Sequence, residues 1–166
     1  MQMINNDSSK KILAAYFSHS GNTRVIAEQI KKIIGCEIFE IKPINVYPNA
    51  YQAVVDQAKK EINANYKPPL TVNLETIDSY DMIFIGSPNW WSTIAPPVAT
   101  FLTAFDFNGK VIIPFITHEG SRMGRSVSDI KKMCPTASVV DEHSFRGSSV
   151  KNAQNEVIDW LKGIKY

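Results

Sequence analysis

Three uninterrupted apolar runs constrain the fold of this 166-residue chain more than any other feature. They span residues 12–17, 82–86 and 111–116, and each is too short for a helix of ordinary length. A polar, turn-forming segment follows each run. A continuous apolar run of this length is typical of a strand buried on both faces, as in a parallel sheet that helices cover on each side. The sequence therefore predicts an α/β protein.

Segments with helical spacing separate these runs. Apolar residues recur three and four positions apart near residues 25–33, 51–62, 98–105, 127–133 and 151–164, and Gly35 and Pro135 follow two of these patterns where a helix should end. Residues 36–41 and 137–140 complete a set of five strands. Regular alternation implies right-handed crossovers and a three-layer sandwich with helices on both faces of a mostly parallel sheet. We expect one domain over residues 10–166 and a disordered polar tail over residues 1–9.

Composition excludes several classes of function. The net charge of +2 and the scattered lysine pairs do not favour a nucleic-acid partner. No apolar stretch reaches the ~18 residues of a membrane span, so we expect no membrane insertion. The two cysteines, Cys36 and Cys134, form no CxxC pattern and fit a reducing, cytoplasmic setting. His19 and His143 are isolated, with no acidic or cysteine ligand at a shared local spacing, and we predict no metal site.

The loop after the first run, residues 18–23, reads Ser-His-Ser-Gly-Asn-Thr and leads directly into a helical pattern. Helix starts expose unpaired N–H groups that attract anions, and hydroxyls and an amide can add further donors. Gly21 would let the backbone approach a phosphate closely. Because no lysine or arginine lies within the loop, it differs from Walker-type phosphate loops. The open alternative is a capped helix start with no ligand.

Two further loops follow the other central strands. Residues 87–92 include the adjacent Trp90 and Trp91, of which one can pack beneath the loop while the other meets a flat ligand. Residues 117–121 offer a threonine hydroxyl, a histidine and backbone donors. For each tryptophan and for His118, ordinary packing or a local hydrogen bond is the alternative. Since loops at the carboxyl ends of parallel strands meet at one edge, the three together predict a site for a ligand with a phosphate and a flat ring.

These residues resemble the flavodoxin family, from Lys11 to about Ile164. Residues 11–23 look like its first strand and phosphate loop, and residues 85–92, 96–102 and 115–121 are similar to a bacterial branch with a Pro-x-Trp-Trp loop. The resemblance implies a flavodoxin-like sheet of strand order 2-1-3-4-5, a short-chain member without an inserted fifth-strand loop, and FMN as cofactor. It implies no catalytic side chain. The cofactor-binding residues it implies are Ser18, His19, Ser20, Gly21, Asn22, Thr23, Ser87, Pro88, Asn89, Trp90, Trp91, Ser92, Thr117, His118, Glu119, Gly120 and Ser121.

The resemblance leaves three functions open. The first is an FMN-binding electron-transfer protein that serves a redox partner protein or a small electron donor or acceptor, as a monomer or homodimer. The second is an NAD(P)H-dependent quinone reductase on the same fold. The near-neutral charge of this chain favours that second function. So does the absence of glycine in residues 87–93, where many flavodoxins have one, because it favours two-electron chemistry. The third is a flavin-free interaction module.

Overall fold

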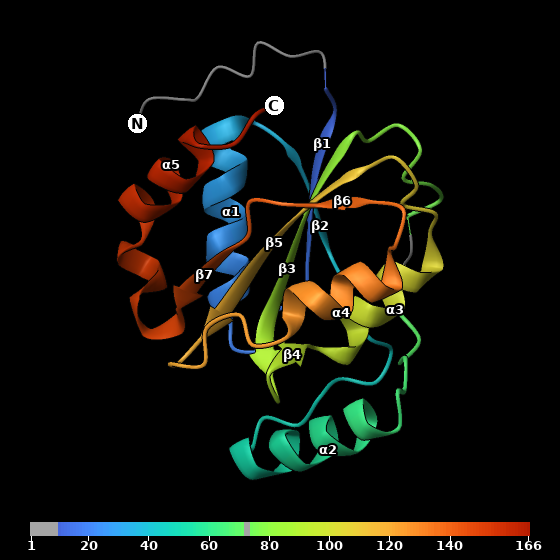
Figure 1. Cartoon of the computed structure of the whole chain (residues 1–166). Coiled ribbons are helices and arrows are strands. Elements are labelled where there is room, and N and C mark those ends of the chain that lie inside the picture. The colour runs from blue at the N-terminus through green and yellow to red at the C-terminus, as the bar shows by residue number, and fades with distance from the viewer. Residues whose placement is uncertain (1–9, 72–73) are drawn as a thin grey trace.

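The computed structural model describes residues 10–71 and 74–166, in which a central sheet is flanked by helices (Figure 1). The expected tail, residues 1–9, lies outside the described residues. No helix in the described ranges is both long and apolar enough to cross a membrane. In chain order the elements are β1 (Ile12–Tyr16), α1 (Asn22–Ile34), β2 (Glu37–Glu40), α2 (Tyr51–Asn63), β3 (Met82–Trp90), β4 (Thr93–Ile94), α3 (Pro96–Ala104), β5 (Val111–His118), α4 (Ser126–Met133), β6 (Ser138–Val139), β7 (His143–Arg146), the 3₁₀ helix η1 (Gly147–Asn152) and α5 (Gln154–Lys162).

The sheet confirms the expected fold class. Its main strands lie in the order β2-β1-β3-β5-β6, which is 2-1-3-4-5 when the five expected strands are counted along the chain. All four pairings along this path are parallel. The centre is formed by the three apolar runs, since β1 lies beside β3 and β3 lies beside β5.

Two parts of the sheet correct the prediction of five strands, because the described residues form seven. The short β4 pairs antiparallel with the end of β3. The fifth strand is divided: β6 pairs with the start of β5, and β7 pairs farther along it. Between them, Asp141 has a φ of 55°, a left-handed conformation that no continuous strand accommodates. The long β5 provides the edge that both pieces share.

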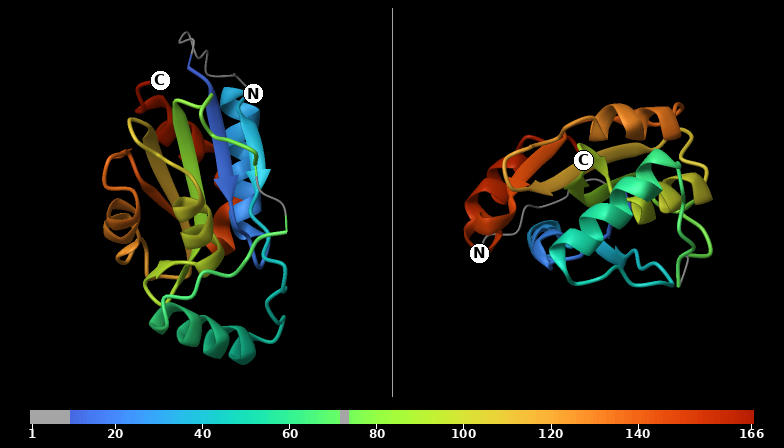
Figure 2. Two further views of the ribbon diagram at one scale, coloured as in Figure 1. Left: turned by 90° about the vertical axis from the view of Figure 1, so that its right-hand side faces the viewer. Right: turned by 90° about the horizontal axis from the view of Figure 1, so that it is seen from below.

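Helices cover both faces of the sheet (Figure 2). Each face has its own cluster of buried apolar side chains. On one face, Phe84 of β3 packs in a cluster with Ile30 of α1 and Val157 of α5. On the other, Ile83 packs in a cluster that includes Val98 of α3. Neighbouring residues of β3 thus point to opposite layers, as the pleat of a strand requires. Both faces are apolar, which explains the uninterrupted runs in the sequence.

Helix α2 departs from the layered arrangement. It lies beyond the carboxyl ends of the strands instead of on a face, at the bottom of Figure 1, and the view from below in Figure 2 shows it crossing this end of the sheet. Long connections, residues 41–50 and 64–81, join it to β2 and β3 and allow this position. Only Val54 and Ala58 are buried in this helix. Because ligands of parallel α/β proteins bind at the carboxyl ends of the strands, α2 is placed to cover such a site.

Candidate functional site

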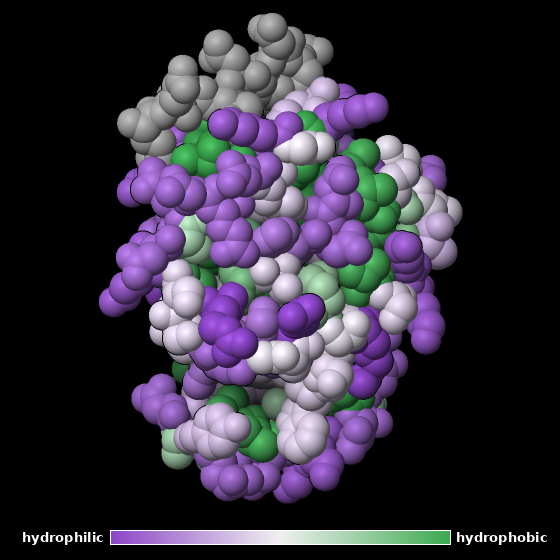
Figure 3. All heavy atoms as spheres, turned by 60° about the vertical axis from the view of Figure 1, so that its left-hand side comes forward, coloured by the Kyte–Doolittle hydropathy of each residue, from purple (hydrophilic) through white to green (hydrophobic). Residues whose placement is uncertain are grey.

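The three loops that the sequence singles out meet at one cavity of about 740 Å³. Ligand pockets in proteins commonly measure ~300–1,000 Å³. Figure 3 shows this region as a hollow low in the view, between the body of the molecule and the end that α2 forms. The cavity is lined by His19, Ser20, Asn22, Asn49, Tyr51, Val54, Val55, Ala58, Pro88, Asn89, Trp90, Trp91, Thr117, His118, Glu119, Gly120, Ser121 and Gly147.

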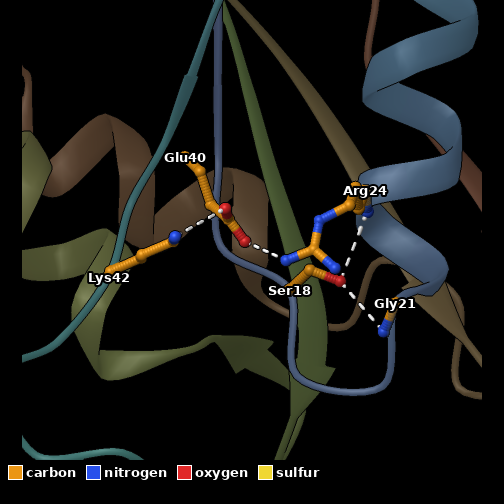
Figure 4. Close-up of polar contacts among 5 residues, drawn as sticks. All are labelled: Ser18, Gly21, Arg24, Glu40 and Lys42. Atoms are coloured by element: carbon orange, nitrogen blue, oxygen red, sulfur yellow. Dashed lines mark hydrogen bonds and ion pairs between the residues drawn. The ribbon is translucent and has the colours of Figure 1, made fainter.

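The first loop presents the start of α1 to this cavity. Gly21 has a φ of 100°, which turns the chain into the helix, and a side chain there would be strained. The Ser18 hydroxyl accepts hydrogen bonds from the N–H groups of Gly21 at 3.1 Å and of Arg24 at 3.3 Å (Figure 4). Among the described residues, the N–H groups of Asn22 and Thr23 have no acceptor. Unpaired donors at the positive end of a helix suit an anion.

Arg24, in the first turn of α1, is held away from the cavity by an ion pair. Its guanidinium donates to Glu40 of β2, and Lys42 lies 3.3 Å from the same carboxylate (Figure 4). Within residues 10–71 and 74–166, no lysine or arginine lines the cavity, and Glu119 is the one acidic residue that does. An anion at the start of α1 would be held by neutral donors and the helix dipole.

The second loop is a tight hairpin rather than an irregular loop. β3 continues to Trp90 because its ladder with β5 extends through Pro88, and Trp90 then pairs with Thr93 of β4. The two turn residues, Trp91 and Ser92, have φ angles of 53° and 66°, as in the type I′ turns that suit the twist of a two-residue hairpin. The hairpin thus sets the directions in which both tryptophans point.

The two tryptophans have different surroundings. The Trp90 ring makes edge-on contacts with Phe17, His19 and Tyr47, at centroid distances of 5.3, 5.8 and 4.9 Å. Trp91 is 45% exposed, and its indole N–H donates to the carbonyl oxygen of Val55 in α2 at 3.0 Å. Both rings line the cavity. Trp90 is therefore anchored within the protein, and Trp91 ties the hairpin to α2.

The third loop continues from β5. The hydroxyls of Thr117 and Thr23 are hydrogen-bonded at 2.9 Å, which joins the third loop to the start of α1. His118 accepts a 2.8 Å hydrogen bond from Gly120 N–H at Nδ1, so the neutral ring carries its proton on Nε2. Burial lowers the pKa of His118, and the positive charge of Arg146 lowers it further. His118 is therefore a neutral donor near pH 7.

Gly147, at the start of η1, completes the wall beside the first loop. A Cβ atom there would lie 2.5 Å from both the Asn22 amide nitrogen and a carboxylate oxygen of Glu119. The absence of a side chain is what lets these two groups occupy the cavity wall. Gly147 carries no signal in the sequence that marks a site, because a glycine at a strand-to-helix junction has many ordinary uses.

Five further lining residues were missed, and all come from α2 or the residues just before it. They are Asn49, Tyr51, Val54, Val55 and Ala58. In the sequence, the apolar members of this set form one face of an amphipathic helix, which is the usual sign of packing against a sheet. Helical periodicity predicts that α2 is a helix, but it does not predict where the helix lies relative to the sheet.

Five of the expected site residues do not line the cavity: Ser18, Gly21, Thr23, Ser87 and Ser92. Ser87 is fully buried, and its hydroxyl accepts a 2.9 Å hydrogen bond from Ala95 N–H. The Ser92 carbonyl accepts a 2.7 Å bond from Arg125 N–H. These residues support the loops from outside the cavity lining. A cofactor role for all the expected residues stays a prediction.

Comparisons with known proteins agree with this geometry. The family model for flavodoxin matches residues 11–164. Among solved structures, a protein of Bacteroides uniformis ATCC 8492 described as a flavoprotein is 27% identical, with a TM-score of 0.82 over 93% of this chain and 99% of that one. A second, of Bacteroides eggerthii DSM 20697, is 27% identical, with a TM-score of 0.76 over 90% and 99%.

The flavoprotein of Lactobacillus acidophilus NCFM, whose crystal structure is a complex with FMN, is 27% identical, with a TM-score of 0.70 over 87% of this chain and 98% of that one. A search of curated proteins gave no match. The bacterial branch with a Pro-x-Trp-Trp loop stays a prediction. The family model covers nearly all of the described residues, and the sheet has the flavodoxin-like strand order 2-1-3-4-5. The chain therefore belongs to the flavodoxin family.

Proposed function

We propose that this protein binds FMN and transfers electrons through it. The supporting observation is a single cavity that joins the free N–H groups at the start of α1 to an aromatic end formed by Trp90, Trp91 and α2. A cavity with hydrogen-bond donors at one end and aromatic rings at the other matches a molecule with a phosphate at one end and a flat tricyclic ring at the other. The complex of the Lactobacillus acidophilus flavoprotein with FMN adds support.

The residues of the cavity divide between the two ends of this cofactor. The N–H group of Asn22 and the Ser20 hydroxyl, whose residues both line the cavity, would hold the phosphate at the positive end of α1. Hydrogen bonds to a charged group contribute ~1.5–3 kcal/mol each, so a few of them dominate the affinity. Trp90 and Trp91 would pack beside the ring, and backbone N–H groups of residues 117–121 would donate to its polar edge, whereas the Glu119 carboxylate lies toward Asn22. Bound FMN supplies the reversible uptake of one or two electrons.

The environment of the cavity leaves proton chemistry to the cofactor. His118 is a donor whose lowered pKa keeps it neutral, and Glu119 is exposed at the cavity wall. Apolar side chains of α2, Val54 and Ala58, exclude water from one side of the cavity. The protein would thus bind, orient and shield FMN. We also place it in the cytoplasm, which agrees with two buried, unpaired cysteines, and we expect a redox partner and no nucleic acid.

An NAD(P)H-dependent FMN reductase is the second candidate. The observation in its favour is a second depression that shares His118 with the cavity and is lined by two arginines, Arg122 and Arg146. Anaerobic mixing of the FMN-loaded protein with NADPH separates the two functions. No flavin bleaching would support an electron carrier, and bleaching within milliseconds to seconds would support a reductase.

FMN binding itself is tested by a charge placed at the start of α1. Asn22→Asp puts a carboxylate at the first helical position, where it favours the helix but repels a phosphate. We expect FMN affinity to fall by at least ~100-fold and riboflavin affinity to stay within about twofold, because a like charge at contact distance costs several kcal/mol. Asn155→Asp makes the same change in the first turn of α5 and is the matched control.

Both affinities are measured by titrating flavin fluorescence with apoprotein. If the wild type binds FMN no better than riboflavin, or if Asn22→Asp behaves like Asn155→Asp, the phosphate does not lie at the start of α1 and the proposal fails.

A further inference from the structure

A second depression of about 470 Å³ adjoins the FMN cavity. Its wall is built where β5 and β7 end side by side, because His118 of β5 pairs in register with Arg146 of β7. Arg122, from the segment after β5, and Ser149 of η1 also line it. His118 lines both depressions and so marks where they meet. Nothing in the proposed binding of FMN uses the arginines of this second depression.

The two arginines lack the partners that the other arginines have. Arg24 is paired with Glu40, and Arg125 lies 3.2 Å from Asp129. Within the described ranges, by contrast, no carboxylate lies within 4.0 Å of the guanidinium of Arg122 or Arg146.

Among the described residues, one carboxylate lines the second depression, and its partner is a histidine of the same lining. Glu156 of α5 is hydrogen-bonded to Nε2 of His143 at 2.9 Å. Two arginines and one carboxylate thus line the depression, which leaves one positive charge in excess, and the hydroxyls of Ser144 and Ser149 lie beside them as neutral donors. That set of groups suits an anion with several oxygen atoms.

Arg122 is fixed in place by the FMN cavity itself. Its φ of 55° is left-handed, a conformation that costs a non-glycine residue ~1–2 kcal/mol. The amide of Asn89, which lines the FMN cavity, donates a 2.7 Å hydrogen bond to the Arg122 carbonyl. A residue kept in an unfavourable conformation by a neighbour at the site is typical of a functional constraint.

We propose that the second depression binds a phosphate group of a small molecule that exchanges electrons with the flavin, and that the rest of this molecule reaches the FMN cavity past His118. Two guanidinium groups and two hydroxyls are donors of the kind that phosphate oxygens accept from, and the excess of arginine over carboxylate favours an anion. A carboxylate would need only one of the arginines. This inference rests on the proposed function, because the flavin is what the phosphate-bearing molecule would reduce or oxidise.

His118 provides a readout that is independent of activity. Its pKa is lowered by burial and by the charges of Arg146 and Arg122, whereas Glu119 and Glu156 act in the opposite direction. A phosphate bound at the two arginines offsets their charge, so it should raise the pKa of His118. A phosphate bound elsewhere on the surface should leave it unchanged.

The experiment uses FMN-loaded protein, in which the cofactor fills the first cavity, and pyrophosphate as the probe. NMR of the histidine rings follows pyrophosphate binding and the pKa of His118. We expect the His118 pKa to rise on saturation and the affinity for pyrophosphate to fall at least ~10-fold in Arg146→Gln and in Arg122→Gln, since each loses a charged hydrogen bond. Lys162→Gln, an equal change of charge at the end of α5, is the matched control.

The outcomes separate the two proposals. If FMN binds but pyrophosphate leaves His118 unshifted, or if both arginine variants behave like Lys162→Gln, the phosphate site is refuted and FMN binding stands. If the protein binds no FMN, the proposed function fails, and a redox role for the second depression fails with it. Both arginines are exposed, so the thermal midpoints of their variants should match the wild type and verify folding.

Discussion

Replacing Thr23 and Thr117 by valine, singly and together, tests how the first and third loops are joined. The two hydroxyls are 2.9 Å apart, and their residues are only 1% and 4% exposed. Either single change removes one hydrogen-bonding partner and leaves the other hydroxyl buried without it. The double change removes both polar groups and keeps the shape of the side chains. The two situations differ strongly in free energy, because a buried hydroxyl without a partner loses its hydration and gains nothing.

The expected magnitudes follow from that asymmetry. Loss of a neutral hydrogen bond costs ~0.5–1.5 kcal/mol, and the cost rises to ~1–3 kcal/mol when a buried hydroxyl is left without a hydrogen-bonding partner. We therefore expect each single variant to lower the free energy of unfolding by about 1–2 kcal/mol and the double variant to lie within about 1 kcal/mol of the wild type. The coupling energy, which is the sum of the two single effects minus the double effect, would then be about 1–5 kcal/mol, a range that includes the ~0.5–3 kcal/mol typical of residues in direct contact.

Urea unfolding of the apoprotein, followed by tryptophan fluorescence and circular dichroism, measures these values. Coincident transitions by the two probes are required for a two-state treatment. Additive single and double variants would refute the bond between the loops. FMN titration adds a second readout: since Thr117 lines the cavity and Thr23 does not, Thr117→Val should weaken FMN binding more than Thr23→Val does.

Three other substitutions or conditions give separate tests. Gly147→Ala should lower FMN affinity by about tenfold, because the added Cβ displaces the side-chain ends of Asn22 and Glu119. Since those ends can move, the thermal midpoint should stay within a few degrees of wild type. An unchanged affinity in fluorescence titration would contradict this. Glu119→Gln should raise FMN affinity severalfold at low salt and less at high salt, with riboflavin affinity unchanged, since it removes a negative charge near the phosphate end. Burial raises the pKa values of Cys36 and Cys134 from 9.0 to about 11, so the folded state holds protons that the unfolded state releases between these values. Stability should therefore fall as pH rises from 9 to 11, and the fall should be shallower in the Cys36→Ala, Cys134→Ala double variant, as measured by urea midpoints.

The sheet could be predicted from the sequence because burial on both faces leaves a direct signature. β1, β3 and β5 appear as runs without a polar residue, and their neighbours are polar turns. The short β4 and β7 have no such signature, since two to four residues at an edge carry too little pattern to be recognised. The predicted ends of β3 and β5 came too early in the sequence. Their last residues, such as Trp90 and His118, face a cavity and are only partly buried, so they do not continue the apolar run.

The candidate site could be predicted only in the part that local sequence controls. The turn at Gly21 and the polar residues around it mark a helix start wherever the rest of the chain lies. The contribution of α2 depends on how long connections place it, so Val54 and Val55 could be assigned to an apolar face but not to the cavity that this face meets. Ser87 shows the opposite error, because a serine at a strand end looks available for a ligand although its hydroxyl bonds to Ala95 N–H.

The hairpin at Trp91 and Ser92 explains how a loop without glycine can stand at this site. Left-handed residues other than glycine are unfavourable by ~1–2 kcal/mol each, and a loop that needed to change conformation would favour glycine. Here the conformation is held instead: Arg125 donates from its backbone to the Ser92 carbonyl at 2.7 Å and from its guanidinium to the Trp91 carbonyl at 3.3 Å. A Cβ at Gly124 would lie 2.4 Å from the same Ser92 oxygen, so the two segments are also in close contact. We therefore expect this turn, held by Arg125 and packed against Gly124, to keep its conformation when the proposed cofactor changes redox state.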